Sequence, residues 1–180
     1  RRLENVKLMA ESGCRALFVG FESIDDSTVR SAGKRQNRPS EYKETMAMLH
    51  EHGIPVWGSF VFGFDGDDVE VFDRTVEFAI DMKLTMANFA ILTPYPGTAL
   101  YRRLHAEGRL LDPRWWLGRD HEAESPYFVP KGMSRERLHE GWVRAWTRFY
   151  SWSGIRRRYV LRAGSGWIQS LGFWPLNVMQ

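Results

Sequence analysis

Residues 60–69 read FVFGFDGDDV, in which an apolar run leads into two glycines, three aspartates and the start of a helical pattern. Short, continuous apolar runs that stop at turn residues are typical of strands buried in a parallel sheet. Residues 14–21 (CRALFVGF) and 85–92 (TMANFAIL) have the same character. The sequence therefore predicts three buried strands, at residues 14–21, 54–64 and 85–92.

Helical periodicity recurs in four segments beside and between these strands, namely residues 3–12, 39–52, 68–82 and 98–107. Ser40 and Thr98 are predicted to cap the second and fourth of these helices. Asp67 or Asp68 is predicted to cap the third. Strands that alternate with helices favour an α/β fold, with a parallel sheet covered by helices.

The charge balance changes near Lys131. Residues 1–130 contain 16 Lys and Arg against 20 Asp and Glu, whereas residues 131–180 contain 9 against 2, together with five of the eight tryptophans. A step of this kind marks a functional or domain boundary. One more amphipathic helix is predicted at residues 134–150, with Ser134 as its cap.

The basic, Trp-rich tail after Gly154 has three interpretations. It packs on the core as a helix with a solvated basic face, it docks on a membrane surface, or it binds nucleic acid. No nucleic-acid partner is expected, because no recognised base-reading motif is present. The single cysteine, Cys14, excludes an internal disulfide and a cysteine-only metal site within this chain. A lone thiol fits a reducing cytosol, so a cytoplasmic location is expected, with peripheral contact at the inner membrane as the alternative.

Each predicted strand is followed by a polar loop, at residues 20–26, 63–68 and 93–98. The carboxyl ends of parallel strands meet at one edge of a sheet, and ligands bind there. Two of the three loops are acidic, which disfavours a phosphate and favours a positively charged ligand. We therefore expect the three loops to surround one site.

Three ordered motifs carry a family resemblance: GCRALFVGFES (13–23) with KRQN (34–37), SFVFGFDGDD (59–68) and ANFAILTPYPGTALY (87–101). Together they resemble the second half of a radical S-adenosylmethionine (radical SAM) enzyme core, in the subgroup that often carries a cobalamin-binding domain. The resemblance implies that residues 1–111 form about three β/α units of a partial TIM-like (β/α)6 barrel. Residues 112–180 would then be a mostly helical, basic, Trp-rich extension.

The resemblance also implies a set of residues that contact S-adenosylmethionine. They are Glu22, Ser23, Lys34, Ser59, Val61, Gly63, Thr93 and Pro94. In that implied arrangement Glu22 and Ser23 meet the ribose or the methionine part of the ligand, and Lys34 meets its carboxylate. The residues of the second and third motifs enclose the adenine. The usual family motif Gly-x-Pro-Gly-Glu-Thr has Asp65 in place of proline and Asp67 in place of glutamate here.

Radical SAM chemistry starts at a 4Fe-4S cluster held by three cysteines, and Cys14 is one cysteine at the wrong place. No metal ligand and no catalytic acid or base is therefore assigned in this chain. Because the sequence also begins with Arg1 rather than Met, we expect a fragment that is inactive without the amino-terminal half of the enzyme.

The intact enzyme is expected to use S-adenosylmethionine, the cluster and cobalamin. It would carry out radical methyl transfer or oxidative rearrangement of a small-molecule or lipid-like substrate. Two other classes stay open from the residues alone. One is a non-catalytic α/β module that binds a small ligand or a partner protein, and the other is a membrane adaptor that works through the tail.

Overall fold

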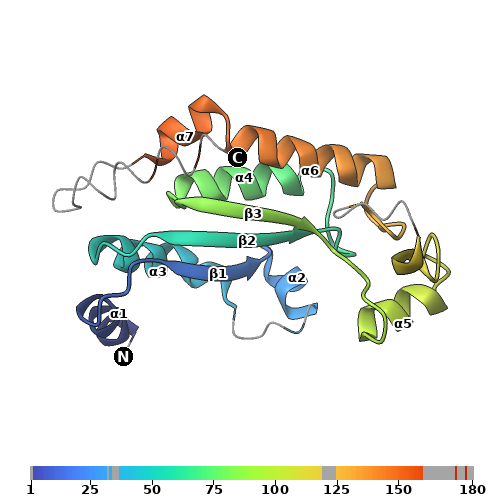
Figure 1. Cartoon of the computed structure of the whole chain (residues 1–180), viewed down its shortest axis with the longest axis horizontal. Coiled ribbons are helices and arrows are strands. Elements are labelled where there is room, and N and C mark those ends of the chain that lie inside the picture. Colours follow the sequence, from blue (N-terminus) through green and yellow to red (C-terminus); the bar gives the residue numbers. More distant parts are fainter. Residues whose placement is uncertain are drawn as a thin grey trace.

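The computed structural model describes residues 2–31, 33, 37–118, 125–159, 173 and 177. These residues contain three strands, β1 (Leu17–Glu22), β2 (Val56–Phe62) and β3 (Met86–Ile91). The strands pair in the order β1-β2-β3, and both pairs are parallel. The predicted parallel α/β sheet is therefore confirmed (Figure 1). Each strand is shorter than predicted, and β1 begins three residues later and ends one residue later than expected.

Helices precede, connect and follow the strands. They are α1 (Arg2–Glu11), α2 (Asp26–Ser31), α3 (Pro39–Glu51), α4 (Val71–Asp81), α5 (Ala99–Ala106), the 3-10 helix η1 (Trp115–Leu117), α6 (Arg135–Phe149) and α7 (Trp152–Arg158). Five of these match the predicted helices, whereas α2, η1 and α7 were not predicted as separate elements. Thr98 and Ser134 cap α5 and α6 as predicted, each accepting a bond from the backbone N–H three residues later.

The predicted cap at Ser40 is wrong. Pro39 begins α3, and the residue before it, Arg38, makes no side-chain capping bond. Proline suits the first helical position because its ring presets the backbone angle and its missing N–H would lack a helical partner there. Ser40 consequently lies inside the first turn of α3, where its hydroxyl does not cap the helix.

The predicted cap at Asp67 or Asp68 is also wrong, because α4 begins only at Val71. Asp68 Oδ1 accepts a hydrogen bond from the backbone N–H of Glu70 at 3.0 Å, in the turn that precedes the helix. The Asp67 carboxylate accepts instead from the backbone N–H groups of Gly63 and Phe64, in the loop that follows β2. The Asp68 carboxylate also bonds the backbone N–H of Val71, the first residue of α4, but the residue at the N-cap position is Glu70, which makes no side-chain capping bond.

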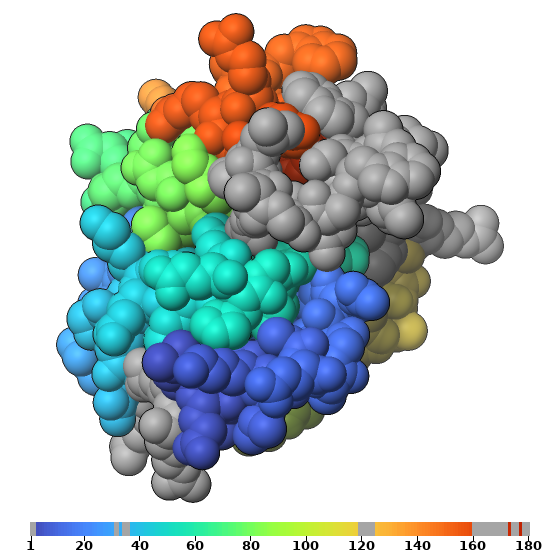
Figure 2. Space-filling view, turned by 90° about the vertical axis from the view of Figure 1, so that its left-hand side faces the viewer, coloured from blue at the N-terminus to red at the C-terminus, as the bar shows by residue number. Residues whose placement is uncertain are grey.

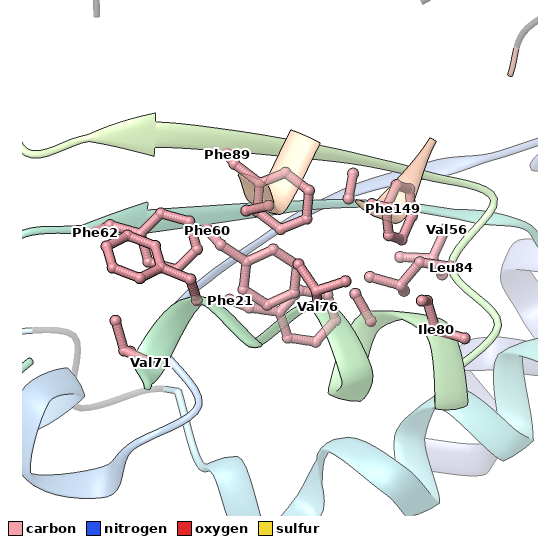
Figure 3. Packing of buried hydrophobic residues seen from close by; sticks show 14 of the residues in the cluster. Phe21, Val56, Phe60, Phe62, Val71, Val76, Ile80, Leu84, Phe89 and Phe149 are labelled. Carbon is pink, nitrogen blue, oxygen red and sulfur yellow. The ribbon is translucent and has the colours of Figure 1, made fainter. Parts of the chain in front are cut away.

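The hydrophobic core lies between the sheet and the helices α3, α4 and α6. Along β2 the residues Val56, Phe60 and Phe62 are fully buried, whereas the alternate residues are not. Figure 3 shows these side chains among others from β3 and α4, with Phe89 and Phe149. In Figure 1, α3 and α4 lie behind the strands. We call the opposite side of the sheet the front face.

The outer edge of β3 is covered by side chains of α6 instead of by a strand. Tyr150 Oη donates to Ala87 O at 2.8 Å and accepts from Ala87 N at 3.2 Å. Trp142 Nε1 and Trp146 Nε1 both donate to Phe89 O, at 2.8 and 3.0 Å. An exposed strand edge is a template for unwanted pairing. The extension therefore completes this edge of the sheet.

The first part of the basic tail packs on the fold. Arg157 pairs with Glu77 and Asp81 of α4. Arg158 is 1% exposed, and its guanidinium lies 3.6 Å from the ring centroid of Phe149. The guanidinium donates to the backbone oxygens of Leu84, Thr85 and Phe149 and to Asn177 Oδ1. The packed-helix interpretation is thus confirmed for α7.

Figure 2 views the end of the molecule at which the strands begin, where the segments near α1 (dark blue) and α7 (orange) occupy opposite extremes. None of the described helices combines the length and the apolar content that a bilayer crossing requires. Membrane contact through the tail stays a prediction, because residues 160–172 lie outside the described part of the chain.

Candidate functional site at the carboxyl edge of the sheet

The three strand-end loops lie together. The register pairs β1 with β2 and β2 with β3 up to their carboxyl ends, and Leu92 N donates to Phe62 O at 2.8 Å beyond the last β3 residue. A Cβ added to Gly66 would lie 3.3 Å from Thr28 Oγ1, so the second loop touches α2. The expected convergence of the three loops on one edge is confirmed.

The front face of the sheet carries three rows of side chains, set by the strand register. The row nearest the amino ends is apolar and contains Phe18, Trp57 and Met86. Gly20, Ser59 and Asn88 form the middle row. Val61 and Ala90 form the row nearest the loops. The polar and small side chains therefore lie in the half of the face that borders the loops.

Glu22 occupies an unusual backbone position at the end of β1. Its φ is 65°, and the register with β2 shifts between Gly20 and Glu22. Such β-bulges redirect side chains near active sites, and a non-glycine residue at positive φ costs about 1–2 kcal/mol. A Cβ built on Gly20 would lie 2.9 Å from Glu22 Oε1. The bulge thus places the Glu22 carboxylate on the front face, above the glycine.

The other predicted site residues of the first two motifs lie in different surroundings. Ser59 and Val61 are half-buried on the front face, next to Glu22. Ser23 is buried instead, and its Oγ accepts from Asp25 N at 3.1 Å, so it holds the first loop. Lys34 lies outside the described residues.

Residues of the third loop are held by internal bonds. Thr93 Oγ1 donates to Ile91 O at 3.0 Å. Pro94 is buried, and its carbonyl accepts from Trp115 Nε1 at 3.2 Å. These contacts fix the backbone of the loop and leave Thr93 half-buried at the edge of the front face. Trp115 was not assigned to the site from the sequence, since the contact spans 21 residues.

Asp67 closes the second loop from inside. It is 4% exposed, and its Oδ2 accepts from Gly63 N at 2.8 Å and Phe64 N at 3.0 Å. Burial raises the pKa of this carboxyl to about 6, although the two N–H donors oppose the rise. Gly63 adopts a φ of 103°, which glycine tolerates best. A Cβ on Gly132 would lie 1.9 Å from Asp67 O, so the extension packs directly against this loop.

Asp65 is likewise engaged within the protein. It accepts from Arg103 at 3.0 Å and Arg109 at 2.8 Å, and Lys131 Nζ lies 3.4 Å away. Burial by itself would raise the pKa of Asp65, but the hydrogen bond and charge of Arg109 and the charge of Arg103 hold it below its usual value. Asp68 pairs with Arg74. The acids of this loop are thus bound by groups of the protein itself, and their attraction for a cationic ligand stays a prediction.

Asn88 is the front-face residue that sequence reasoning missed. It lies beside Ser59 in the register and is half-buried. The sequence does contain a signal for this position, since Asn88 is the one polar residue between Met86 and Leu92. Glu22, Ser59 and Asn88 together offer a carboxylate, a hydroxyl and an amide to one ligand. Within the described residues, no group of three or more His, Cys, Asp or Glu side chains is arranged for a metal ion.

Two protein families match successive parts of this chain. Residues 1–79 match the Radical SAM superfamily, and residues 98–163 match a domain of unknown function, DUF4070. Bacteriochlorophyllide d C-12(1)-methyltransferase of Chlorobaculum tepidum is 31% identical over 155 residues, which are 86% of this chain and 33% of that protein.

Two further relatives are more distant. Anaerobic magnesium-protoporphyrin IX monomethyl ester cyclase of Cereibacter sphaeroides is 26% identical over 89% of this chain and 27% of its own length. Hopanoid C-2 methylase of Rhodopseudomonas palustris is 24% identical over 88% of this chain and 28% of its own length. The chain spans about a third or less of the relatives it matches, and it contains part of a radical SAM domain.

Proposed function

We propose that this chain supplies the adenosine-binding wall of a radical SAM enzyme. In this proposal β1, β2 and β3 are the fourth, fifth and sixth strands of a partial (β/α)6 barrel. The observation that carries it is the bulge at Glu22, which lies within the matched radical SAM segment and directs a carboxylate onto the front face beside Ser59. Strained residues of this kind cluster at functional sites.

S-adenosylmethionine fits the groups on the front face. The Glu22 carboxylate can accept hydrogen bonds from a ribose hydroxyl or from the ammonium group of the methionine part. Ser59 and Asn88 offer donors and acceptors to the adenine, and Val61 and Ala90 offer an apolar surface to its ring. Gly63, Thr93, Pro94 and Lys34 complete the proposed set. Burial of Ser23 makes it a residue that positions the first loop.

A 4Fe-4S cluster does not fit this chain, because its 180 residues contain one cysteine and such clusters need several thiolate ligands. In our proposal the cluster is bound by residues outside these 180, and the chain acts as part of a longer enzyme. When bound, the cluster supplies the electron that cleaves S-adenosylmethionine. The residues described above bind and orient the cofactor and exclude water from it.

For the complete enzyme we propose methyl transfer to an organic substrate, with cobalamin as a second cofactor. The names of two of the relatives, a methyltransferase and a methylase, support methyl transfer. The name of a third, a cyclase, keeps oxidative ring formation as the alternative. A cytoplasmic location is part of the same proposal.

Calorimetric titration of the chain with S-adenosylmethionine tests the binding role. We expect saturable binding that Glu22→Gln weakens about tenfold, since a charge-assisted hydrogen bond contributes roughly 1.5–3 kcal/mol. Glu44→Gln is the matched control, because Glu44 is exposed on α3 and lies outside the proposed site. Absent binding, or equal weakening by both changes, would contradict the proposal.

A further inference from the structure

Five tyrosine and tryptophan side chains form a connected group beyond the carboxyl end of β3. We call this group the aromatic shelf; its members are Tyr95, Tyr101, Trp115, Trp116 and Tyr127. Their ring centroids are linked by separations of 4.1 to 6.1 Å, with Trp115 stacked on Tyr127 and in contact with both Tyr95 and Trp116. Figure 1 places α5 and the following segment at the end of the molecule toward which the strands point.

Two rings of the aromatic shelf are exposed to solvent, and both contact the buried ring of Trp115. Tyr95 is 62% exposed and Trp116 is 37% exposed, whereas Trp115 is 5% exposed. Leu117, which follows in the chain, is also exposed. Exposed contiguous apolar surfaces mark binding sites more often than scattered apolar residues do. The exposed rings of the shelf are therefore a candidate contact surface.

Prolines and hydrogen bonds hold the backbone around the shelf. Prolines 94 and 96 flank Tyr95, whose backbone carbonyl accepts from Thr98 Oγ1 at 2.7 Å. Tyr101 Oη donates to Pro113 O at 2.7 Å, which ties α5 to the segment before Trp115. A preorganised surface loses little entropy on binding and favours a ligand that is itself rigid.

The shelf is also continuous with the proposed cofactor site. Trp115 Nε1 donates to Pro94 O, and Tyr95 N donates to Thr93 O at 3.0 Å. The same loop thus contributes Thr93 to the proposed S-adenosylmethionine site and Tyr95 to the shelf. A molecule lying on the shelf is placed beside the cofactor at the carboxyl edge of the sheet.

The charges around the shelf narrow the choice of ligand. Arg102 and Arg114 are exposed, and they adjoin Tyr101 and Trp115 in the chain. Arg102 Nη1 donates to Gly97 O at 2.7 Å, so its guanidinium is held against the third loop. Guanidinium groups recognise carboxylates, and aromatic faces recognise flat π-systems.

We propose that the aromatic shelf binds the substrate, and that this substrate is a flat, conjugated ring system that carries a carboxylate. This inference rests on the proposed function, because it names the substrate class of the same site. A flexible acyl chain would leave the preorganised rings without stacking partners, and a small polar substrate would leave the apolar shelf exposed.

Zinc protoporphyrin IX is a suitable probe, since it is a flat macrocycle with two carboxylates. Titration of the chain with this probe, followed by its absorbance and induced circular dichroism, is expected to show saturable binding. Trp116→Ala and Tyr95→Ala should each weaken it about tenfold. Trp116→Leu keeps an apolar side chain and should weaken binding to the same degree. Trp152→Ala, which removes a 70% exposed tryptophan of α7, should leave it unchanged.

Three results would overturn the inference. They are the absence of saturable binding, an equal loss with Trp152→Ala, and displacement of the probe by dodecyl maltoside at its monomer concentration. S-adenosylmethionine titrated into the same samples separates the two proposals. Cofactor binding without macrocycle binding rejects the shelf alone, whereas macrocycle binding without cofactor binding rejects the proposed function and leaves the shelf as a ring-binding surface.

Discussion

The two outer edges of the sheet are built differently. At β3, Trp142 and Trp146 of α6 and the C-cap residue Tyr150 bond the outward-facing backbone groups of Ala87 and Phe89. At β1, no strand of the described residues pairs with the outer edge. Asn37 Nδ2 donates to Gly20 O at 2.8 Å and to Phe21 O at 3.1 Å, and Tyr42 Oη donates to Phe21 O at 3.3 Å. Phe18 is 63% exposed beside Trp57. The extension therefore completes one side of the sheet and leaves the other side available.

The extension also shares a hydrophobic core with the sheet and α4. Leu138, Ala145 and Phe149 of α6 belong to the same hydrophobic cluster as Phe89 and the residues of α4. The aromatic residues of α6 thus have two roles: their rings fill the core, and their polar atoms satisfy the edge of β3. Removal of the extension would expose both the cluster and the edge.

The largest expected effect comes from separating α6 from α4. A Cβ on Gly141 would lie 2.2 Å from Phe72 Cε2, so Gly141→Ala forces the two helices apart. We expect the free energy of unfolding to fall by about 3 kcal/mol, the upper end for overpacking. Urea denaturation measures it, with the neighbouring exposed residue change Glu140→Ala as control. A loss below about 1 kcal/mol would mean that α6 does not pack as described.

The next largest effect is a pH dependence of the free energy of unfolding, which comes from Asp67. Its pKa of about 6 in the folded protein exceeds its usual value of 3.8, so the folded state binds the proton more tightly. The stability this group contributes is therefore present below pH 3.8 and is lost as the pH rises through 6. The loss is on the order of 2–3 kcal/mol.

Asp67→Asn should remove that dependence and keep an oxygen for the N–H groups of Gly63 and Phe64. Urea denaturation of both proteins between pH 4 and 7 provides the measurement. The stability of the wild type relative to the variant should fall as the pH rises. Parallel curves would show that Asp67 ionises normally, and that the extension does not seal the loop through Gly132.

Tyr150→Phe tests the covered edge itself. The change leaves Ala87 N and O without the hydroxyl, and an unsatisfied buried polar group costs about 1–3 kcal/mol. Amide hydrogen exchange should accelerate at Ala87 more than at Ala90, whose backbone N–H points toward β2. Unchanged exchange at Ala87 would show that Tyr150 does not cover the edge.

Phe18→Ser should have the smallest effect, within about 0.5 kcal/mol, because the ring is mostly exposed. Thermal denaturation of the chain can detect a larger change. A loss as great as that of Gly141→Ala would mean that the β1 side is covered as fully as the β3 side, and the difference between the two edges would disappear.

Local patterns predicted much of this fold. The three strands, their parallel order and the meeting of the loops follow from apolar runs that alternate with helices. The caps at Thr98 and Ser134 follow from residue type at a helix start. The same rule failed at Asp67, because a nearby pair of N–H groups, at Gly63 and Phe64, competes for its carboxylate once the loop folds.

Contacts between segments that are distant in the sequence could not be predicted from local patterns. Tyr150 bonds Ala87 across 63 residues, and Arg158 bonds Leu84 across 74. The tail looked like a basic surface, yet Arg158 is buried among carbonyl groups, and that burial lowers the pKa of its guanidinium to about 10. The positive φ of Glu22 also had no signal in the local sequence, since glycine and asparagine are the residues that most often adopt it.

The most direct test of the account maps S-adenosylmethionine onto the chain by amide chemical shifts. We expect titration to shift the amides of Glu22, Ser59, Val61, Asn88 and Thr93, which border the front face at the carboxyl edge. The amides of α6 and α7 should stay in place. Shifts confined to α6, α7 or the amino-end row of Phe18 and Trp57, or no shift at saturating ligand, would contradict the assignment of this face as the adenosine-binding wall.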